Sequence, residues 1–380
     1  MRRQGAAKTA RPLLPGMARP SRDPEEHAAE LSPLLRAWFA ESSRDLPWRV
    51  NYTPYEVWIS EIMLQQTQMD RAVNYFRRWM ERLPDVAALA GASEETVLRL
   101  WEGLGYYSRA RNLMAAARRI MTEHGGVFPA KVEQIRALPG IGPYTAAAVA
   151  SIAFGAPVAC VDANVERVLS RLFDVKTPAR REPAASFIRQ WALRLVPGDA
   201  AREHNQAMME LGALVCRKTP RCGLCPWSGY CRARHLGVAA ERPVKDEGPG
   251  MTALETVAGI LEARGRILVH RRPARGVWGG LWEFPGGVLA AGEKPGAALA
   301  RSLLAETGLV VVPGRGGKIL HTRTRYRITL HWRRLAMAES AAETLPGLSD
   351  KSWRWATREE LAGLPLPAPH RKVADLALGG

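Results

Sequence analysis

A turn bracketed by two glycines constrains the fold of this chain most. Residues 138–144 read Leu-Pro-Gly-Ile-Gly-Pro-Tyr, and the apolar run after them predicts a helix over Thr145–Ile152. Glycine permits backbone conformations that turn successive N–H groups outward, and the helix adds the positive end of its dipole. Gly140 and Gly142 are therefore predicted to bind an anion such as a nucleic-acid phosphate. An ordinary turn between two helices fits the same residues.

Asp162 stands just before a second predicted helix, Ala163–Leu172. Aspartate is a common helix N-cap, because its carboxylate accepts a backbone N–H of the first turn. A carboxylate close to an anion-binding turn also suits chemistry on a nucleic acid. Both interpretations, a cap and a catalytic acid, stay open at this point.

Four of the five cysteines form one cluster, Cys216-x5-Cys222-x2-Cys225-x5-Cys231. Four thiolates this close together suit either a tetrahedral zinc ion or a cubane iron–sulfur cluster, and a disulfide scaffold is not expected. Zinc knuckles usually carry two Cys-x2-Cys pairs, whereas this pattern has one tight pair between two wide arms. Cys160 stands apart and is predicted to be a packed core thiol.

The charge balance points to an anionic partner. The chain has 54 Lys and Arg against 37 Asp and Glu, a net charge of +17. Nucleic acid is the leading partner for such a surplus, and an anionic membrane surface is the alternative. No stretch is long and apolar enough to predict a membrane span. We expect a monomer without membrane association. Because no targeting signal is apparent, we expect it in the cytoplasm of a bacterial-type cell.

The pattern predicts a multi-domain protein with α and α/β parts. Residues 1–24 are predicted to be a disordered basic arm, 25–233 a helical domain, 234–250 a linker and 251–375 an α/β domain. The helical periodicity predicts these segments: Glu30–Glu41, Pro54–Met69, Val73–Arg82, Glu94–Glu102, Ser108–His124, Val132–Ala137, Glu182–Leu195 and Asn205–Val215. The α/β part is predicted to have strands Thr252–Ala263, Arg266–Arg271, Lys318–Leu320 and Tyr326–Leu335 and a helix Lys294–Thr307.

Glu61 lies on a predicted helix in mostly apolar company. Val57, Trp58 and Leu64 are its neighbours at helical spacing. Burial raises the pKa of a carboxyl group, which is what a proton donor at neutral pH requires. A glutamate at the edge of a core helix, paired with an arginine, is the alternative. The amide-rich run Gln65–Gln68 suits contact with base edges or with the gap left by an extruded base.

Three motifs together resemble the MutY-type adenine DNA glycosylases of the helix-hairpin-helix superfamily. They are Leu-Pro-Trp-Arg at 46–49, the helix at 55–68, and Trp-Glu-Gly-Leu-Gly-Tyr-Tyr-Ser-Arg-Ala-Arg-Asn-Leu at 101–113. The resemblance covers residues 30–231 closely and the second domain more loosely. It implies an all-helical glycosylase domain with an iron–sulfur loop, followed by a Nudix-like domain. It also implies removal of adenine mispaired with 8-oxoguanine or guanine in double-stranded DNA.

The resemblance implies a role for each matching residue. Glu61 becomes the general acid that protonates adenine, Asp162 the carboxylate that stabilises the sugar cation, and Tyr144 and Asn164 their supports. Gln66 and Tyr106 are expected to wedge into the duplex. The adenine pocket is expected to be lined by Trp48, Arg49, Leu64, Met69, Gln206 and Met209.

Tyr144 decides which chemistry is expected. Relatives that resemble endonuclease III carry a lysine there, which forms a Schiff base. A phenol cannot form an imine, so we expect a monofunctional enzyme with water as the nucleophile. Two carboxyl groups whose environments separate their pKa values suit that hydrolysis, as in glycoside hydrolysis.

The resemblance also favours a [4Fe–4S] cluster on Cys216, Cys222, Cys225 and Cys231, although the first gap has five residues here and usually six in the family. We expect the cluster to serve structure and DNA docking. Arg217, Lys218 and Arg221 on its first loop are expected to contact phosphate.

The second domain resembles a Nudix box at Gly287, Glu293, Arg301, Glu306 and Gly308. Ser302 and Ala305 stand where a working box has metal-binding acids, so we expect a Nudix fold without hydrolase activity. In this family the domain recognises 8-oxoguanine. The recognition loop usually reads Phe-Ser-His but here reads Arg323-Thr324-Arg325, so Thr324 is expected to supply the hydroxyl contact.

Two other functions remain open. One is a related glycosylase for another base or with lyase activity. The other is a non-catalytic iron–sulfur protein that binds DNA. Tyr144 and the adenine-pocket residues argue against the first, and the presence of both Glu61 and Asp162 argues against the second.

Overall fold

The computed structural model describes residues 22–246, 250–273, 278–323, 326–337 and 352–379. By their contacts the residues form two compact units, which are described separately. The first contains residues 1–58, 130–137 and 141–246, and the second contains residues 59–129, 138–140 and 247–380. Within the described residues, no helix has the length and apolar character needed to cross a bilayer.

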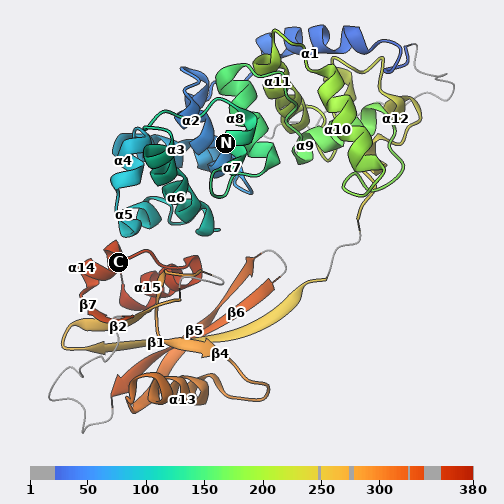
Figure 1. Cartoon of the computed structure of the whole chain (residues 1–380). Coiled ribbons are helices and arrows are strands. Elements are labelled where there is room, and N and C mark those ends of the chain that lie inside the picture. The colour runs from blue at the N-terminus through green and yellow to red at the C-terminus, as the bar shows by residue number, and fades with distance from the viewer. Residues whose placement is uncertain (1–21, 247–249, 274–277, 324–325, 338–351, 380) are drawn as a thin grey trace, which may run out of the picture. The chain divides into compact units, whose positions relative to one another are not determined.

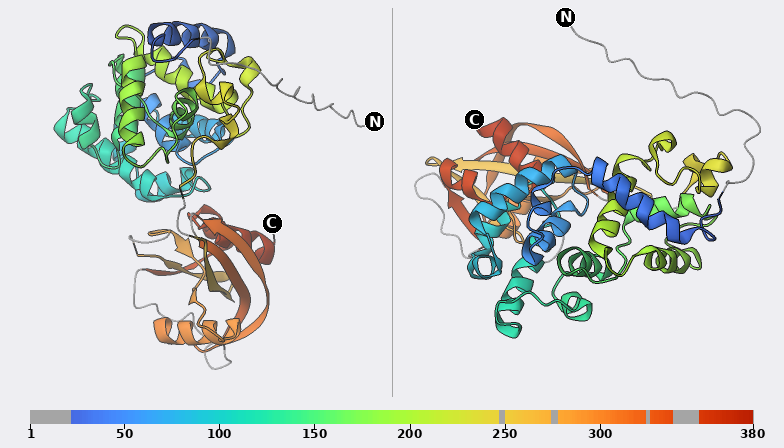
Figure 2. Two further views of the ribbon diagram at one scale, coloured as in Figure 1. Left: turned by 90° about the vertical axis from the view of Figure 1, so that its right-hand side faces the viewer. Right: turned by 90° about the horizontal axis from the view of Figure 1, so that it is seen from above.

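The first unit is helical (Figures 1 and 2). Its elements are α1 (Ala28–Ser42), η1 (Pro47–Arg49), the first part of α2 (Pro54–Leu64), α7 (Val132–Ala137), α8 (Pro143–Phe154), α9 (Ala163–Leu172), α10 (Ala184–Leu195), α11 (Ala201–Leu214), η2 (Cys222–Leu224), α12 (Arg232–His235) and η3 (Ala239–Glu241). The apolar faces of α1, α9, α10 and α11 share one core, which includes Leu35, Leu169, Trp191 and Leu211.

Described residues at the edges of the predicted arm and linker contact the helical unit. Residues 1–21 lie outside the described residues, but Arg22 forms an ion pair with Glu30, 2.8 Å away. At the other end, Arg242 donates to the buried carboxylate of Asp174 at 2.8 Å, and Val244 pairs with Pro178. These contacts hold residues 234–246 against the helical unit, because a buried carboxylate requires a charged partner.

The second unit begins with helices that follow α2. They are α3 (Met69–Arg82), α4 (Val86–Gly91), α5 (Glu94–Leu100) and α6 (Ser108–Glu123). The predicted helix Pro54–Met69 is wrong at its end, because α2 stops at Leu64 and Gln66 has a positive φ of 58°. The sequence analysis also gave no element for α4, whose N-cap is Asp85.

A mixed sheet forms the rest of the second unit. Its strands are β1 (Thr252–Ala263), β2 (Arg266–Arg271), β3 (Trp282–Glu283), β4 (Gly286–Val288), β5 (Val311–Arg323), β6 (Tyr326–Met337) and β7 (Trp353–Ala356). The path through the sheet is β3-β2-β1-β6-β5, with β1 parallel to β6 and β4 and β7 as side branches. The bounds of β1 and β2 agree with the predicted strands.

Helices cover both faces of this sheet (Figure 1). On one face α13 (Pro295–Thr307) packs its Leu299 against Val257 and Leu261 of β1. On the other face α14 (Arg358–Gly363) and α15 (Ala368–Leu378) pack against Ala258 and Ile260 of the same strand. Successive β1 side chains therefore fill opposite cores, as the pleat requires.

Two ends of this domain differ from the prediction. Strand β5 begins at Val311, well before the predicted start at Lys318, because the glycine-rich residues before Lys318 belong to the strand, with a bulge between Pro313 and Gly316. A Cβ on Gly316 would lie 1.9 Å from the carbonyl oxygen of Trp332, so this close approach requires glycine. The domain also extends beyond residue 375, to the end of α15 at Leu378.

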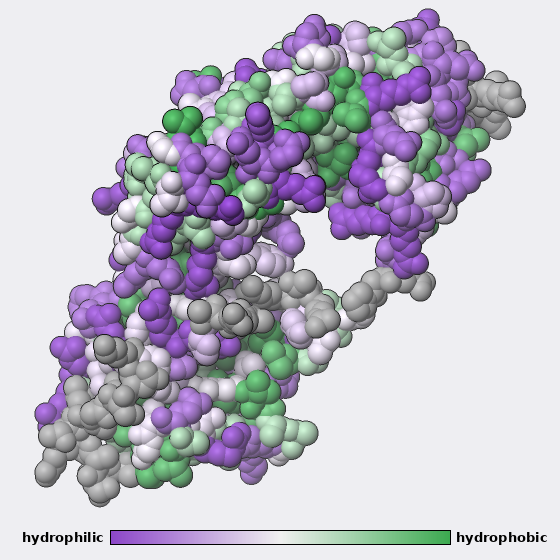
Figure 3. Space-filling model, viewed as in Figure 1, coloured by the Kyte–Doolittle hydropathy of each residue, from purple (hydrophilic) through white to green (hydrophobic). Residues whose placement is uncertain are grey.

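Hydrophilic residues predominate on the face shown in Figure 3.

Candidate active site

Asp162 caps α9 and is held by two neutral donors. Its Oδ1 accepts a hydrogen bond from the backbone N–H of Val165 at 2.8 Å, and its Oδ2 accepts one from the Asn164 amide, also at 2.8 Å. The predicted N-cap is thereby confirmed. The cap is compatible with the predicted catalytic role, which stays a prediction.

Asn164 is itself held from the far side by Arg167, which the sequence analysis did not single out. The Arg167 guanidinium donates to Asn164 Oδ1 at 2.7 Å, to the carbonyl of Gly212 at 2.8 Å and to the carbonyl of Cys216 at 2.7 Å. Burial lowers the pKa of Arg167. A chain of hydrogen bonds thus joins Asp162 to the cysteine loop.

Gly212 allows α11 to approach this group. A Cβ built on Gly212 would lie 2.5 Å from Cβ of Asn164 and 3.1 Å from its Cα. Such a distance is far below van der Waals contact, so any larger residue would displace Asn164.

The predicted anion-binding turn uses its two glycines differently. Gly140 has a φ of 74°, and a Cβ on it would lie 2.4 Å from Cβ of Asn112. Gly142 is extended at the N-cap of α8, with φ −87°, and Pro143 follows at the first helical position. Only Gly140 therefore needs the left-handed conformation, and phosphate binding by either glycine stays a prediction.

Tyr144 and Met209, two predicted site residues, lie together. The Tyr144 hydroxyl is 3.0 Å from the sulfur of Met209. Tyr144 also lines an open pocket between α8, α9 and α10, with Val161 and Glu166 among the other lining residues. Asp162 is not among the residues that line this pocket.

Arg49 is engaged by a carboxylate that sequence reasoning missed. Glu210, with a side chain only 2% exposed, accepts from Arg49 at 3.0 Å and from Arg44 at 2.7 Å. Burial opposes ionisation of Glu210, but the hydrogen bonds from both arginines outweigh it and hold its pKa below the usual value. Its position one helical turn after Gln206 was the available signal.

Two further pocket residues of the first unit are buried. Trp48 is 6% exposed and Gln206 is 4% exposed. The Gln206 amide lies 3.4 Å from the Tyr52 hydroxyl. Trp48, Arg49, Gln206 and Met209 therefore belong to one unit, although their contact with adenine stays a prediction.

The remaining predicted residues of the helical region lie in the second unit. Glu61 is 7% exposed on α2, so its predicted burial is confirmed. Leu64 ends α2 and Met69 begins α3, and both are half-buried. Between them the exposed Gln66 has a φ of 58°, and the half-buried Tyr106 has a φ of 49°. Glu61 and Asp162 belong to different units.

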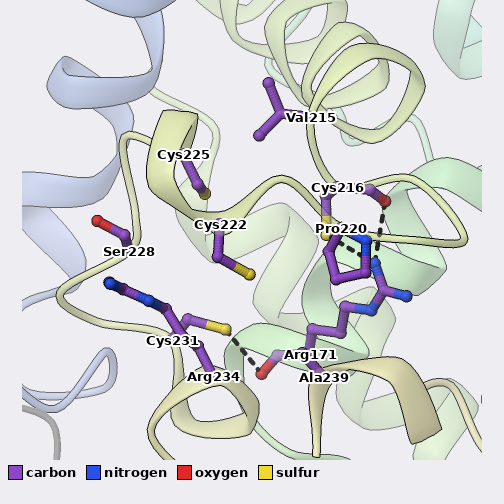
Figure 4. A pocket seen from close by; sticks show the side chains of 10 residues that line it. All are labelled: Arg171, Val215, Cys216, Pro220, Cys222, Cys225, Ser228, Cys231, Arg234 and Ala239. Carbon is purple, nitrogen blue, oxygen red and sulfur yellow. Dashed lines mark hydrogen bonds between the residues drawn. The ribbon is translucent and has the colours of Figure 1, made fainter. Parts of the chain in front are cut away.

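The four clustered cysteines surround one pocket in the first unit (Figure 4). The pocket has about 300 Å³ of empty space, part of it open to solvent. Burial raises the pKa of the Cys225 and Cys231 thiols to about 12. Within the described residues, no three Cys, His, Asp or Glu side chains converge closely enough to hold a single metal ion.

Arg171 organises the first arm of this loop. Its guanidinium donates to the carbonyls of Cys216 and Arg217, at 3.2 and 2.5 Å, and lies 3.4 Å from Cys216 Sγ. The side chain is 2% exposed.

In the Nudix-like part, two predicted box residues pair with each other. Glu293 accepts from Arg301 at 2.9 and 3.0 Å. Sequence reasoning missed a second pair, Glu283 and Arg272, at 2.7 Å to each carboxylate oxygen. Burial raises the pKa of Glu283, and Arg272 opposes that rise. Thr324 and Arg325 of the predicted recognition loop lie outside the described residues.

Two family models match this chain, one in the helical part and one in the Nudix-like part. Residues 59–192 match the HhH-GPD superfamily of base excision DNA repair proteins, and residues 256–376 match the NUDIX domain. The human protein named adenine DNA glycosylase is 34% identical over 405 residues, covering 89% of this chain and 72% of the human chain. The adenine DNA glycosylase of Mycobacterium tuberculosis H37Rv is 40% identical over 245 residues, covering 63% and 78%. A solved structure of a thermostable thymine-DNA glycosylase has a TM-score of 0.50 at 27% identity, covering 55% of this chain and 96% of that one.

Proposed function

This chain belongs to the adenine DNA glycosylase family, and we propose that it acts on adenine mispaired with 8-oxoguanine or guanine. It is a base excision repair enzyme that removes adenine from DNA. The observation that carries the proposed chemistry is the state of Asp162. Its two oxygens are held by the Val165 N–H and the Asn164 amide, and no charge on either donor cancels that of the carboxylate.

The reaction requires a proton on the base and negative charge near the sugar. Adenine leaves poorly until it is protonated, and Glu61, 7% exposed, is the group we assign to that step. As the N-glycosidic bond breaks, positive charge develops on the sugar, and the Asp162 carboxylate stabilises it. Water then adds to the sugar carbon and loses a proton, which leaves an abasic site and free adenine.

Tyr144 supports hydrolysis without strand cleavage. Its hydroxyl lies against Met209 at the position where bifunctional relatives carry an amine. A phenol cannot form the imine that β-elimination requires. Borohydride treatment during the reaction is therefore expected to trap no abundant covalent protein–DNA adduct.

DNA binding is supported by charge and by the turn before α8. The net charge of +17 favours the phosphate backbone. The first turn of α8, which follows Gly142 at its N-cap, offers backbone N–H groups to a phosphate. The base must leave the stack before catalysis, at a cost of a few kcal/mol.

We assign a [4Fe–4S] cluster to Cys216, Cys222, Cys225 and Cys231. All four cysteines line one pocket, and cysteine thiolates are the usual ligands of such a cluster. The cluster would supply a rigid cross-link of the loop and no step of base excision. Cys225 and Cys231, whose thiol pKa is about 12, would release protons when the cluster binds.

Single-turnover excision on three duplexes tests the proposal. The duplexes place adenine opposite 8-oxoguanine, guanine or thymine. We expect fast release from the first, slower release from the second and little from the third. Glu61→Gln is expected to remove the activity, whereas Glu56→Gln on the same helix is expected to keep it. Equal release from all three duplexes would contradict mispair recognition, and no release by the native protein would refute the enzyme assignment.

A further inference from the structure

Arg109 connects two loops of the second unit from inside. Its Nη1 donates to the carbonyls of Ile62 and Gln65, at 2.6 and 2.7 Å. Its Nη2 donates to the carbonyls of Leu104 and Gly105, each at 3.1 Å. One planar side chain therefore binds the end of α2 and the loop before α6 at the same time.

The two loops each present a residue with a left-handed backbone. Gln66 has a φ of 58° and Tyr106 a φ of 49°. For residues with a Cβ this conformation costs roughly 1–2 kcal/mol. It persists only where the surrounding structure enforces it.

The guanidinium acts on the peptide units that set these two angles. The carbonyl of Gln65 belongs to the peptide plane that precedes Gln66, and the carbonyl of Gly105 belongs to the plane that precedes Tyr106. The orientation of that plane relative to the residue after it is the angle φ. By accepting from Arg109, both planes are fixed by the same rigid group.

The surroundings of Arg109 suit an internal clamp. Its guanidinium carbon lies 5.1 Å from the ring centre of Trp101 and 5.6 Å from that of Tyr106. The Trp101 indole N–H also donates to the Gly105 carbonyl at 3.0 Å. Burial lowers the pKa of Arg109 to about 10, so the side chain stays charged at neutral pH.

We propose that Arg109 is a positioning residue that sets the spacing of Gln66 and Tyr106 for entry into the DNA duplex. The inference rests on the proposed function, which assigns those two residues to the wedge. Arg109 itself acts through main-chain carbonyls and not through DNA. A lysine keeps the charge but lacks the planar fork, so it cannot bind both loops in this geometry.

Arg109→Lys tests the proposal, with Arg119→Lys as the matched control. Arg119 lies on the same helix, is exposed and pairs with Glu123 at 2.7 Å. We expect Arg109→Lys to slow single-turnover excision at least about tenfold, the scale of a displaced binding group. A 2-aminopurine next to the target adenine is expected to show reduced unstacking. Arg119→Lys is expected to excise and unstack as the native protein does.

A double-mutant cycle with Tyr106→Ala separates positioning from general structural support. If Arg109 acts through Tyr106, Arg109→Lys costs less than about twofold once the ring is gone. An equal loss in both backgrounds, or native excision by Arg109→Lys, would overturn the proposal. Absence of excision by the native protein would instead refute the proposed function. Failure of the Arg109 inference and failure of the proposed function are therefore distinguishable.

Hydrogen exchange of the native protein tests, without any variant, whether the two loops are held. The amides of Thr67 and Leu104 lie in the two clamped loops, and Gly125 lies in an exposed turn. We expect the clamped amides to exchange at least about tenfold more slowly than that of Gly125. Exchange at the rate of Gly125 would show that the loops are not held, and would overturn the inference.

Discussion

The helical part and the Nudix-like part hold their acidic residues in opposite ways. Asp162 is bound by a backbone N–H and by the neutral amide of Asn164. Glu293 and Glu283 are bound by the guanidinium groups of Arg301 and Arg272, each through two close contacts. All three carboxylates are hydrogen-bonded, but only the two in the Nudix-like part accept hydrogen bonds from a charged group.

We propose that this difference separates a reactive carboxylate from a structural one. A carboxylate held by neutral donors keeps its charge for a cation that forms during the reaction. A carboxylate paired with arginine has its charge neutralised already, and a metal ion or substrate must first break the pair. The type of donor is therefore more informative than the burial of the acid.

Asp162→Asn tests the comparison with the largest expected effect. Asparagine is as good an N-cap as aspartate, so α9 is expected to form normally. Losing the charge is expected to slow single-turnover excision by at least about 10³-fold, roughly 4 kcal/mol. Thermal unfolding monitored by circular dichroism is expected to match the native protein.

Glu293→Gln is the matched control in the Nudix-like part. It removes an acid that is already paired with Arg301, so excision is expected to change less than about twofold. If Asp162→Asn and Glu293→Gln had the same excision rate, the distinction between the two kinds of carboxylate would be lost.

Arg272→Met tests the paired carboxylate by removing its cation. Glu283 is 15% exposed, and leaving it unpaired is expected to cost about 1–3 kcal/mol of unfolding free energy at pH 7.5. Burial already raises the pKa of Glu283, and without Arg272 it rises further. A raised carboxyl pKa favours the protonated native state, so the loss shrinks as the pH falls through that pKa.

Urea unfolding at several pH values measures this effect. Adding Glu283→Gln to Arg272→Met is expected to recover most of the lost stability at pH 7.5, because no buried charge then remains. A loss that does not depend on pH would mean that the arginine acts by packing alone.

Gly212→Ala tests the neutral amide donor that binds Asp162. Its Cβ would lie 2.5 Å from that of Asn164, so the amide that holds Asp162 must move. We expect excision about tenfold slower and a stability loss of about 1–3 kcal/mol. Gly198→Ala is the control, because a Cβ there meets nothing within 4 Å. Native excision by Gly212→Ala would show that the Asn164 contact is dispensable.

Local patterns were sufficient for much of the fold. The sequence patterns of β1 and α9 gave bounds that the structure reproduces. The predicted end of α2 was wrong because no glycine or proline marks it. The helix ends at Leu64, where Arg109 donates hydrogen bonds to the carbonyls of Ile62 and Gln65. Arg109 is distant in sequence, so the local pattern does not show this contact.

The candidate site was predictable where a motif is contiguous. Asp162 as a cap and the burial of Glu61 followed from their neighbours in sequence. Arg167 and Glu210 were missed because they have partners in distant segments of the chain: Arg167 donates to the carbonyls of Gly212 and Cys216, and Glu210 binds Arg44. A single sequence does not pair residues that only tertiary folding brings together.

Because Asp162 caps α9, its side chain becomes ordered when the helix forms. The hydrogen bond from the Val165 N–H fixes the rotamer of Asp162 at the moment the helix is initiated. The entropy lost in orienting that carboxylate is therefore lost during folding, before any DNA is bound. In the proposed mechanism, the barrier to glycosidic cleavage then includes little reorganisation of this carboxylate.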